Sequence, residues 1–75
     1  MTDAYIEALN LEPYQKRVLK EERDLNESIE KLNNFIASLE FTQLPEDEQI
    51  LLNQQHHAML DLARILKKRT DKFNG

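Results

Sequence analysis

The 75-residue sequence contains no cysteine, one glycine and two prolines. Without cysteine, neither a disulfide, a thiolate zinc site nor thiol chemistry is possible. The glycine is the C-terminal Gly75, and so few helix breakers favour long helices over hairpin-rich β structure. A chain of this length forms one domain at most and buries a modest core. We therefore expect a small all-α protein that self-associates.

Long hydrophobic runs are also absent, and none approaches the roughly 20 residues that a membrane-spanning helix needs. Residues 1–10 include acids where a secretory signal would have a basic region and an apolar stretch. We therefore expect a cytoplasmic protein with no membrane partner. The net charge of −4 argues against DNA or RNA as a partner, because nucleic-acid-binding domains are usually basic.

Two long segments show the seven-residue spacing of one helical stripe. In residues 13–40 the apolar positions are Val18, Leu25, Leu32 and Leu39, with Ile29 and Ile36 beside them and a break at Glu22. In residues 45–73 they are Leu52, Met59, Leu66 and Phe73. Each segment opens with a proline, Pro13 or Pro45, which suits a first helical turn.

A short turn at residues 41–44 joins the two helices, so they are expected to be antiparallel neighbours. Residues 1–12 form a leader with a short helix before Asn10. The sequence leaves open whether the leader folds back on the hairpin or reaches another subunit. The predicted fold is therefore a single-domain antiparallel helical hairpin with a short N-terminal helical leader.

The second helix carries a further apolar row beside its heptad stripe: Leu51, Ala58, Leu62 and Ile65. One partner helix covers one stripe, and leftover apolar surface normally marks an interface. A homo-oligomeric helical bundle is the economical interpretation. The alternative is that helix one and the leader cover the whole face.

Nine of the ten basic residues fall in two stretches that the hairpin brings to its open end: Lys16, Arg17, Lys20, Arg23, Arg64, Lys67, Lys68, Arg69 and Lys72. Residues 1–24 and 64–75 contain nine basic and seven acidic side chains, a balance of +2. Residues 25–63 contain one and seven, a balance of −6. We expect an anion to bind at the open end, although solvated pairs at helical spacing explain any single residue equally well.

Tyr14 adjoins this cluster, and Arg17 follows one helical turn later on the same face. An aromatic ring beside cations suits a nucleotide, since the base stacks and the cations meet phosphate. An interface tyrosine with its hydroxyl in water is the competing interpretation.

Metal binding and catalysis have little support in the sequence. His56 and His57 point about 100° apart on a helix and cannot chelate one ion together. His57 and Asp61, four residues apart on a helix, could supply two ligands to one metal ion, but no third ligand is evident. No nucleophile has a paired base, and a glycine-rich phosphate loop is impossible. We expect a protein that is not an enzyme and needs no cofactor or metal.

Several segments resemble small phage hairpin proteins of the anti-CBASS and Thoeris anti-defence type: Pro13–Val18, Glu21-Glu22, Leu25, Ile29–Leu32, Phe35-Ile36, Phe41, Leu44-Pro45, Glu48-Gln49, Leu52, Gln55, Ala58-Met59 and Ile65-Leu66. The resemblance covers about residues 13–70. It implies a sponge that sequesters a cyclic nucleotide immune signal without degrading it, and that assembles as a homo-oligomer, typically a hexamer, with pockets between subunits. It also implies ligand contacts by Tyr14 and by a helix-one lysine, best matched by Lys31.

The leading hypothesis is therefore a sponge for cyclic oligonucleotides, meaning cyclic dinucleotides, cyclic trinucleotides or cyclic ADP-ribose isomers. Tyr14 would stack on a base, and Arg17 and Lys31 would neutralise phosphates. A second, more basic site would use Arg64, Lys68 and Arg69. The alternative is a protein-interaction module, an adaptor or inhibitor of a host protein, which would use the surplus apolar row.

Overall fold

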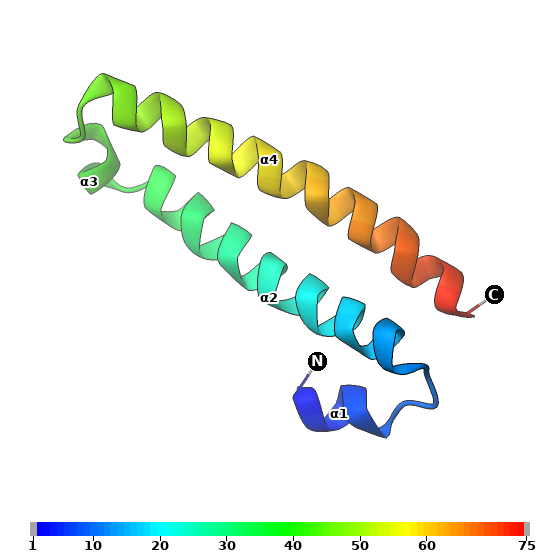
Figure 1. Cartoon of the computed structure of the whole chain (residues 1–75). Coiled ribbons are helices and arrows are strands. Elements are labelled where there is room, and N and C mark those ends of the chain that lie inside the picture. Colours follow the sequence, from blue (N-terminus) through cyan, green and yellow to red (C-terminus); the bar gives the residue numbers. More distant parts are fainter. Residues whose placement is uncertain (1, 75) are drawn as a thin grey trace.

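The computed structural model describes residues 2–74, and over this range the chain is helical with no strand. The elements are α1 (Asp3–Ala8), α2 (Pro13–Ile36), α3 (Leu39–Thr42), α4 (Glu46–Asp71) and a closing 3₁₀ turn, Lys72–Asn74. Figure 1 shows α2 and α4 running side by side in opposite directions, with α1 folded back near the start of α2. The predicted hairpin is confirmed, whereas its assembly into an oligomer stays a prediction.

The first long helix starts where the sequence predicts and ends earlier. Pro13 occupies the first turn of α2, and the Gln15 side chain accepts a hydrogen bond from the Glu12 N–H at 2.9 Å. The helix was predicted to reach residue 40, but it ends at Ile36. Ser38 is extended, and its hydroxyl accepts from the Phe41 N–H at 3.4 Å, so it caps the separate helix α3. A serine that offers the backbone this N-terminal cap competes with continuation of the helix.

Helix α4 also differs at its ends from the predicted range 45–73. Pro45 is the residue before the helix, which runs from Glu46 to Asp71. The first turn carries three acids and the last turn two bases, which both match the helix dipole. Among the described residues, no helix is long and apolar enough to cross a membrane.

The buried core lies mainly at the open end of the hairpin. Ile6 of α1 is 0% exposed and Leu66 of α4 is 2% exposed, and Val18 and Leu19 of α2 are also buried. Helix α1 packs on α2 within the same chain. The leader therefore folds back on the hairpin, which settles the choice that the sequence left open.

The polar interruption of the apolar stripe has a partner across the hairpin. Glu22 is half-buried, and its carboxylate accepts a hydrogen bond from the Thr70 hydroxyl at 3.3 Å. The Thr70 hydroxyl also lies 3.0 Å from the Lys67 carbonyl oxygen. Glu22 therefore links α2 to α4 through a hydrogen bond, whereas an apolar residue at this position would contribute only packing.

The two apolar rows of α4 have different environments. The heptad row faces α2 and is buried or half-buried: Leu52, Met59, Leu66 and Phe73. The second row is exposed, with Leu51 at 57%, Leu62 at 44% and Ile65 at 55%. Helix α2 and the leader leave this row uncovered, so the surplus apolar face predicted from the sequence exists in the single chain.

Candidate functional site

A pocket of about 520 Å³ opens between the start of α2 and the end of α4. We call it the open-end pocket, and it is lined by Tyr14, Arg17, Val18, Lys20, Glu21, Asp24 and Arg69. All of these residues except Arg69 come from α2. The antiparallel packing of α4 supplies Arg69 from the other end of the chain, so the pocket exists only in the folded hairpin.

Tyr14 stands at the N-terminal end of the pocket, in the first turn of α2. Its ring meets the Phe73 ring edge to face, with centroids 6.4 Å apart and planes at 86°. This contact orients the tyrosine, yet 53% of the residue remains exposed. An oriented and partly open aromatic ring is suited to stacking against a planar ligand group.

Arg17 and Arg69 are the cations of the pocket that have no internal partner in the described chain. Both side chains are exposed, and neither makes an ion pair within residues 2–73. Arginine presents a planar fork of donors that matches the geometry of phosphate oxygens. Tyr14 and the two guanidinium groups therefore line the same pocket, a combination that suits an anion carrying a flat ring.

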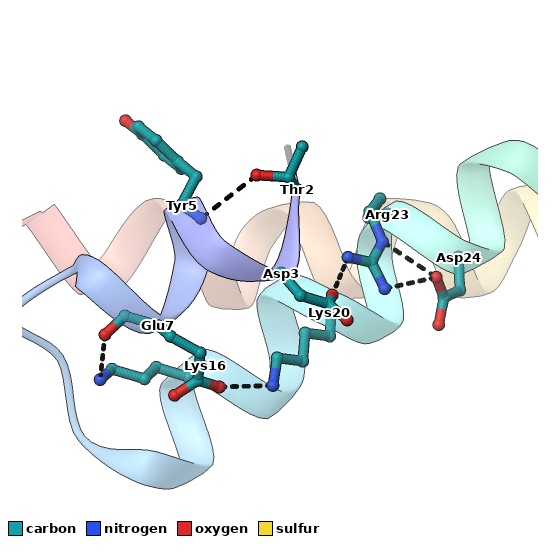
Figure 2. A network of polar contacts seen from close by, with 8 residues as sticks. All are labelled: Thr2, Asp3, Tyr5, Glu7, Lys16, Lys20, Arg23 and Asp24. Atoms are coloured by element: carbon teal, nitrogen blue, oxygen red, sulfur yellow. Dashed lines mark hydrogen bonds and ion pairs between the residues drawn. The ribbon is translucent and has the colours of Figure 1, made fainter.

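Three other cations of α2 are bound to the leader, as Figure 2 shows. Lys20 forms an ion pair with the Glu7 carboxylate, and Arg23 forms one with Asp3 and another with Asp24. The Lys16 ammonium donates to the backbone carbonyl of Glu7 at 2.9 Å. The positive charge predicted for the open end is therefore partly neutralised within the chain.

The protonation equilibria reflect these leader contacts. The hydrogen bond from Arg23, followed by its charge, lowers the pKa of Asp3 below 3.8. Lys20 lowers the pKa of Glu7 below 4.5 in the same way, and Glu7 in turn raises the pKa of Lys20. Both carboxylates are thus ionised at neutral pH and remain bound to their cations.

The structure brings together three of the six predicted site residues: Tyr14, Arg17 and Arg69. Arg64 and Lys68 lie outside the open-end pocket on α4, and Arg64 pairs with Asp61. Lys31 is exposed farther along α2. Because α2 is continuous, Lys31 stands about 25 Å along the axis from Tyr14, at about 1.5 Å per residue.

Sequence reasoning did not assign Lys20, Glu21 or Asp24 to the site. Glu21 follows Arg17 by four residues and Asp24 follows it by seven, so helical spacing alone places both carboxylates on the same face. The sequence carried this signal, but paired acids on a helix surface are common and gave no reason to select them. Nothing in the sequence indicated that Glu7 would bind Lys20.

The histidine pair shows no arrangement of metal ligands. Among the described residues, no group of three or more His, Asp or Glu side chains is placed to hold a metal ion. Asp61, which with His57 was the candidate pair of metal ligands, is bound by the Arg64 guanidinium. The rings of His56 and His57 lie 6.4 Å apart at 89°.

Comparison with protein-family models gives a match over most of the chain. The family model described as Sequestin matches residues 12–72, which include α2, α3, α4 and every residue that lines the open-end pocket. Helix α1 lies outside the matched region. No curated protein and no solved structure matches the chain.

Proposed function

The chain belongs to the Sequestin family, and we propose that it binds and sequesters cyclic oligonucleotide immune signals without degrading them. The members of this family are cyclic-nucleotide sponges of the anti-defence type. The ligand is a cyclic dinucleotide or a related cyclic signal such as a cyclic trinucleotide or a cyclic ADP-ribose isomer. The protein acts in the host cytoplasm during phage infection, as a binding protein and not as an enzyme.

The observation that carries this proposal is the composition of the open-end pocket. Two helices contribute one half-exposed aromatic ring, Tyr14, and two arginines, Arg17 and Arg69, that have no internal partner in the described chain. The base of a nucleotide stacks on Tyr14, and the phosphates bind Arg17 and Arg69.

Sequestration requires tight binding, and the pocket of one chain is open to solvent on one side. Nanomolar affinity corresponds to about −12 kcal/mol, more than a shallow site on one hairpin supplies. The exposed row of α4 supports assembly into a homo-oligomer, for which a hexamer is our proposal. In that assembly Lys31 reaches the ligand from a neighbouring subunit, and Arg64 and Lys68, which lie outside the open-end pocket, form a second site.

Isothermal titration calorimetry against cyclic dinucleotides, cyclic trinucleotides and cyclic ADP-ribose isomers tests the proposal. We expect nanomolar binding of at least one of these ligands. The ligand should be recovered chemically intact by chromatography after the protein is heat-denatured. Absence of binding by the folded oligomer would refute the proposed function, and recovery of a linear product would refute sequestration without degradation.

Charge-removing variants on α4 locate the site. Arg69→Gln should weaken binding of the best ligand about tenfold or more, because a hydrogen bond to a charged group contributes about 1.5–3 kcal/mol. Lys67→Gln is the matched control, since it removes one positive charge from the same turn but alters a side chain that pairs with Asp71. Equal losses in both variants would mean that only the overall charge matters.

The exposed row of α4 also supports a second candidate function, a module that binds a host protein. Five α4 residues with large apolar side chains are at least 39% exposed: Ile50, Leu51, Leu60, Leu62 and Ile65. A monomeric or dimeric protein that co-purifies with a defined host protein and binds no cyclic nucleotide would favour this function over the sponge.

A further inference from the structure

Lys20 lines two neighbouring pockets of the surface. One is the open-end pocket that contains Tyr14. The other has a volume of about 290 Å³ and is lined by Glu7, Pro13, Lys16, Arg17 and Lys20. We call this second site the leader pocket. The two pockets share Arg17 and Lys20, so an anion extending across both would meet these two cations, together with the carboxylates of Glu7, Glu21 and Asp24.

Glu7 occupies the position of an anion in the leader pocket. Its carboxylate binds the Lys20 ammonium, and its backbone carbonyl accepts from the Lys16 ammonium at 2.9 Å. Two of the three cations of this pocket are therefore satisfied by one residue of α1. The third, Arg17, has no ion-pair partner within residues 2–73.

The leader holds Glu7 in place by contacts that do not involve the carboxylate itself. Ile6, its neighbour in sequence, is completely buried. Asp3, one turn earlier on α1, pairs with Arg23. Because α1 is fixed at these two points, a ligand phosphate that approaches Lys20 must compete with a carboxylate already positioned beside it.

We propose that Glu7 is a specificity-determining residue: it holds Lys20 in the place of a third phosphate, so that the pocket prefers ligands with two phosphates to larger cyclic oligonucleotides. This inference rests on the proposed function and names the ligand class of the same site. Arg17 and Arg69 then bind the two phosphates of a cyclic dinucleotide, and Lys20 contributes only when Glu7 releases it.

The test compares two ligands with the same base and different phosphate number, cyclic di-AMP and cyclic tri-AMP. Calorimetry on the intact protein should show tighter binding of cyclic di-AMP. Glu7→Gln should raise the affinity for cyclic tri-AMP about fivefold, because one surface ion pair is added. The same variant should raise the affinity for cyclic di-AMP less than twofold. Glu7→Asp keeps the charge but shortens the side chain, and should give a smaller gain in the same direction.

Three control variants separate release of Lys20 from other effects. Glu30→Gln removes an equal charge from an exposed position of α2 outside both pockets and should leave the ligand preference unchanged. Asp3→Asn loosens the leader but keeps the Glu7 carboxylate, and should give a smaller gain than Glu7→Gln. The double variant Glu7→Gln/Lys20→Gln should lose the gain of Glu7→Gln. A gain that persists without Lys20, or a gain in Asp3→Asn as large as that in Glu7→Gln, would overturn the inference.

Tripolyphosphate, an anion without a base, tests the inference independently of cyclic nucleotides. In NMR titrations it should shift the Lys20 side-chain signals in Glu7→Gln more than in the unmodified protein. Equal shifts would overturn the role of Glu7 even if cyclic nucleotides bind. If no cyclic nucleotide binds any variant, the proposed function fails, and the tripolyphosphate result alone decides whether Glu7 controls access of anions to Lys20.

Discussion

At the open end of the hairpin, three helices meet around Ile6, Leu19 and Leu66, and ion pairs join the leader to α2. In the half nearer the turn, α2 and α4 form a two-helix ribbon in which Phe41 is the one buried residue between positions 20 and 65. The open end thus has α1 to cover its apolar surface, whereas the turn half has only the four-residue helix α3. This difference explains why the buried core is concentrated at the open end, while exposed apolar side chains extend along α4 from Ile50 to Ile65.

The comparison predicts very different costs for leucine truncations in the two regions. Leu66→Ala should lower the free energy of unfolding by about 2–5 kcal/mol, because Leu66 is 2% exposed and its loss leaves a cavity. Leu51→Ala should change it by about 0.5 kcal/mol or less in the monomer, since Leu51 is 57% exposed. Urea unfolding of dilute protein measures both. Similar losses would show that Leu51 is buried in solution, against the difference drawn between the two regions.

Charge placed on the exposed row of α4 should affect assembly and not folding. Leu62→Glu puts a carboxylate into the proposed interface and should weaken self-association at least tenfold, about 1.4 kcal/mol. Helicity by circular dichroism should be unchanged. Sedimentation velocity measures the association. The control is Asn53→Glu, which adds a charge at an exposed α4 position about 160° around the helix from Leu51. An unchanged sedimentation profile would exclude this row from the interface.

Removal of the aromatic ring tests the ligand-binding side of the open end. Tyr14→Ala should weaken binding of the preferred cyclic nucleotide by about 1–3 kcal/mol, the range measured for stacking of a base on an aromatic residue. Tyr14→Phe should keep most of the affinity, because it retains the ring and its contact with Phe73. Tyr5→Ala, in the exposed leader, is the control. Equal affinity of the Tyr14→Ala variant and the unmodified protein would refute a stacking role.

The smallest expected effect is the response of the leader to acid. The pKa values of Asp3 and Glu7 are lowered in the folded chain, so their contribution is complete above their ordinary values of 3.8 and 4.5. It is lost as the pH falls through the lowered values. Amide hydrogen exchange in α1 should therefore accelerate, relative to α4, below about pH 4. The Asp3→Asn/Glu7→Gln variant should lack this acid step, and an unchanged step would assign it to other carboxylates.

Much of the fold could be predicted because its signals are local. The seven-residue spacing of the apolar positions and the prolines at 13 and 45 indicated two helices and their order, and these were confirmed. The end of α2 was predicted wrongly, since the apolar pattern continues to Leu39 and hides the cap that Ser38 provides for α3. A capping hydrogen bond of one side chain is weaker as a sequence signal than a stripe of leucines.

The candidate site could be predicted only in part, because it combines two distant segments. Tyr14 and Arg17 share a helical face by spacing alone, and Arg69 joins them because α4 runs antiparallel to α2. The pairing of Lys20 with Glu7 could not be predicted, since it depends on the leader's fold-back. Whether Lys31 joins the site depends on an assembly that a single chain does not contain.

By itself the sequence determined that this chain is helical, that it has two long amphipathic segments and that its cations concentrate near their outer ends, because residue spacing and helix breakers act over a few neighbours. Only the tertiary structure decided which cations remain available. Docking of α1 places Asp3 and Glu7 against Arg23 and Lys20, and leaves Arg17 and Arg69 beside Tyr14. Charges separated by tens of residues cancel or persist according to how the helices pack.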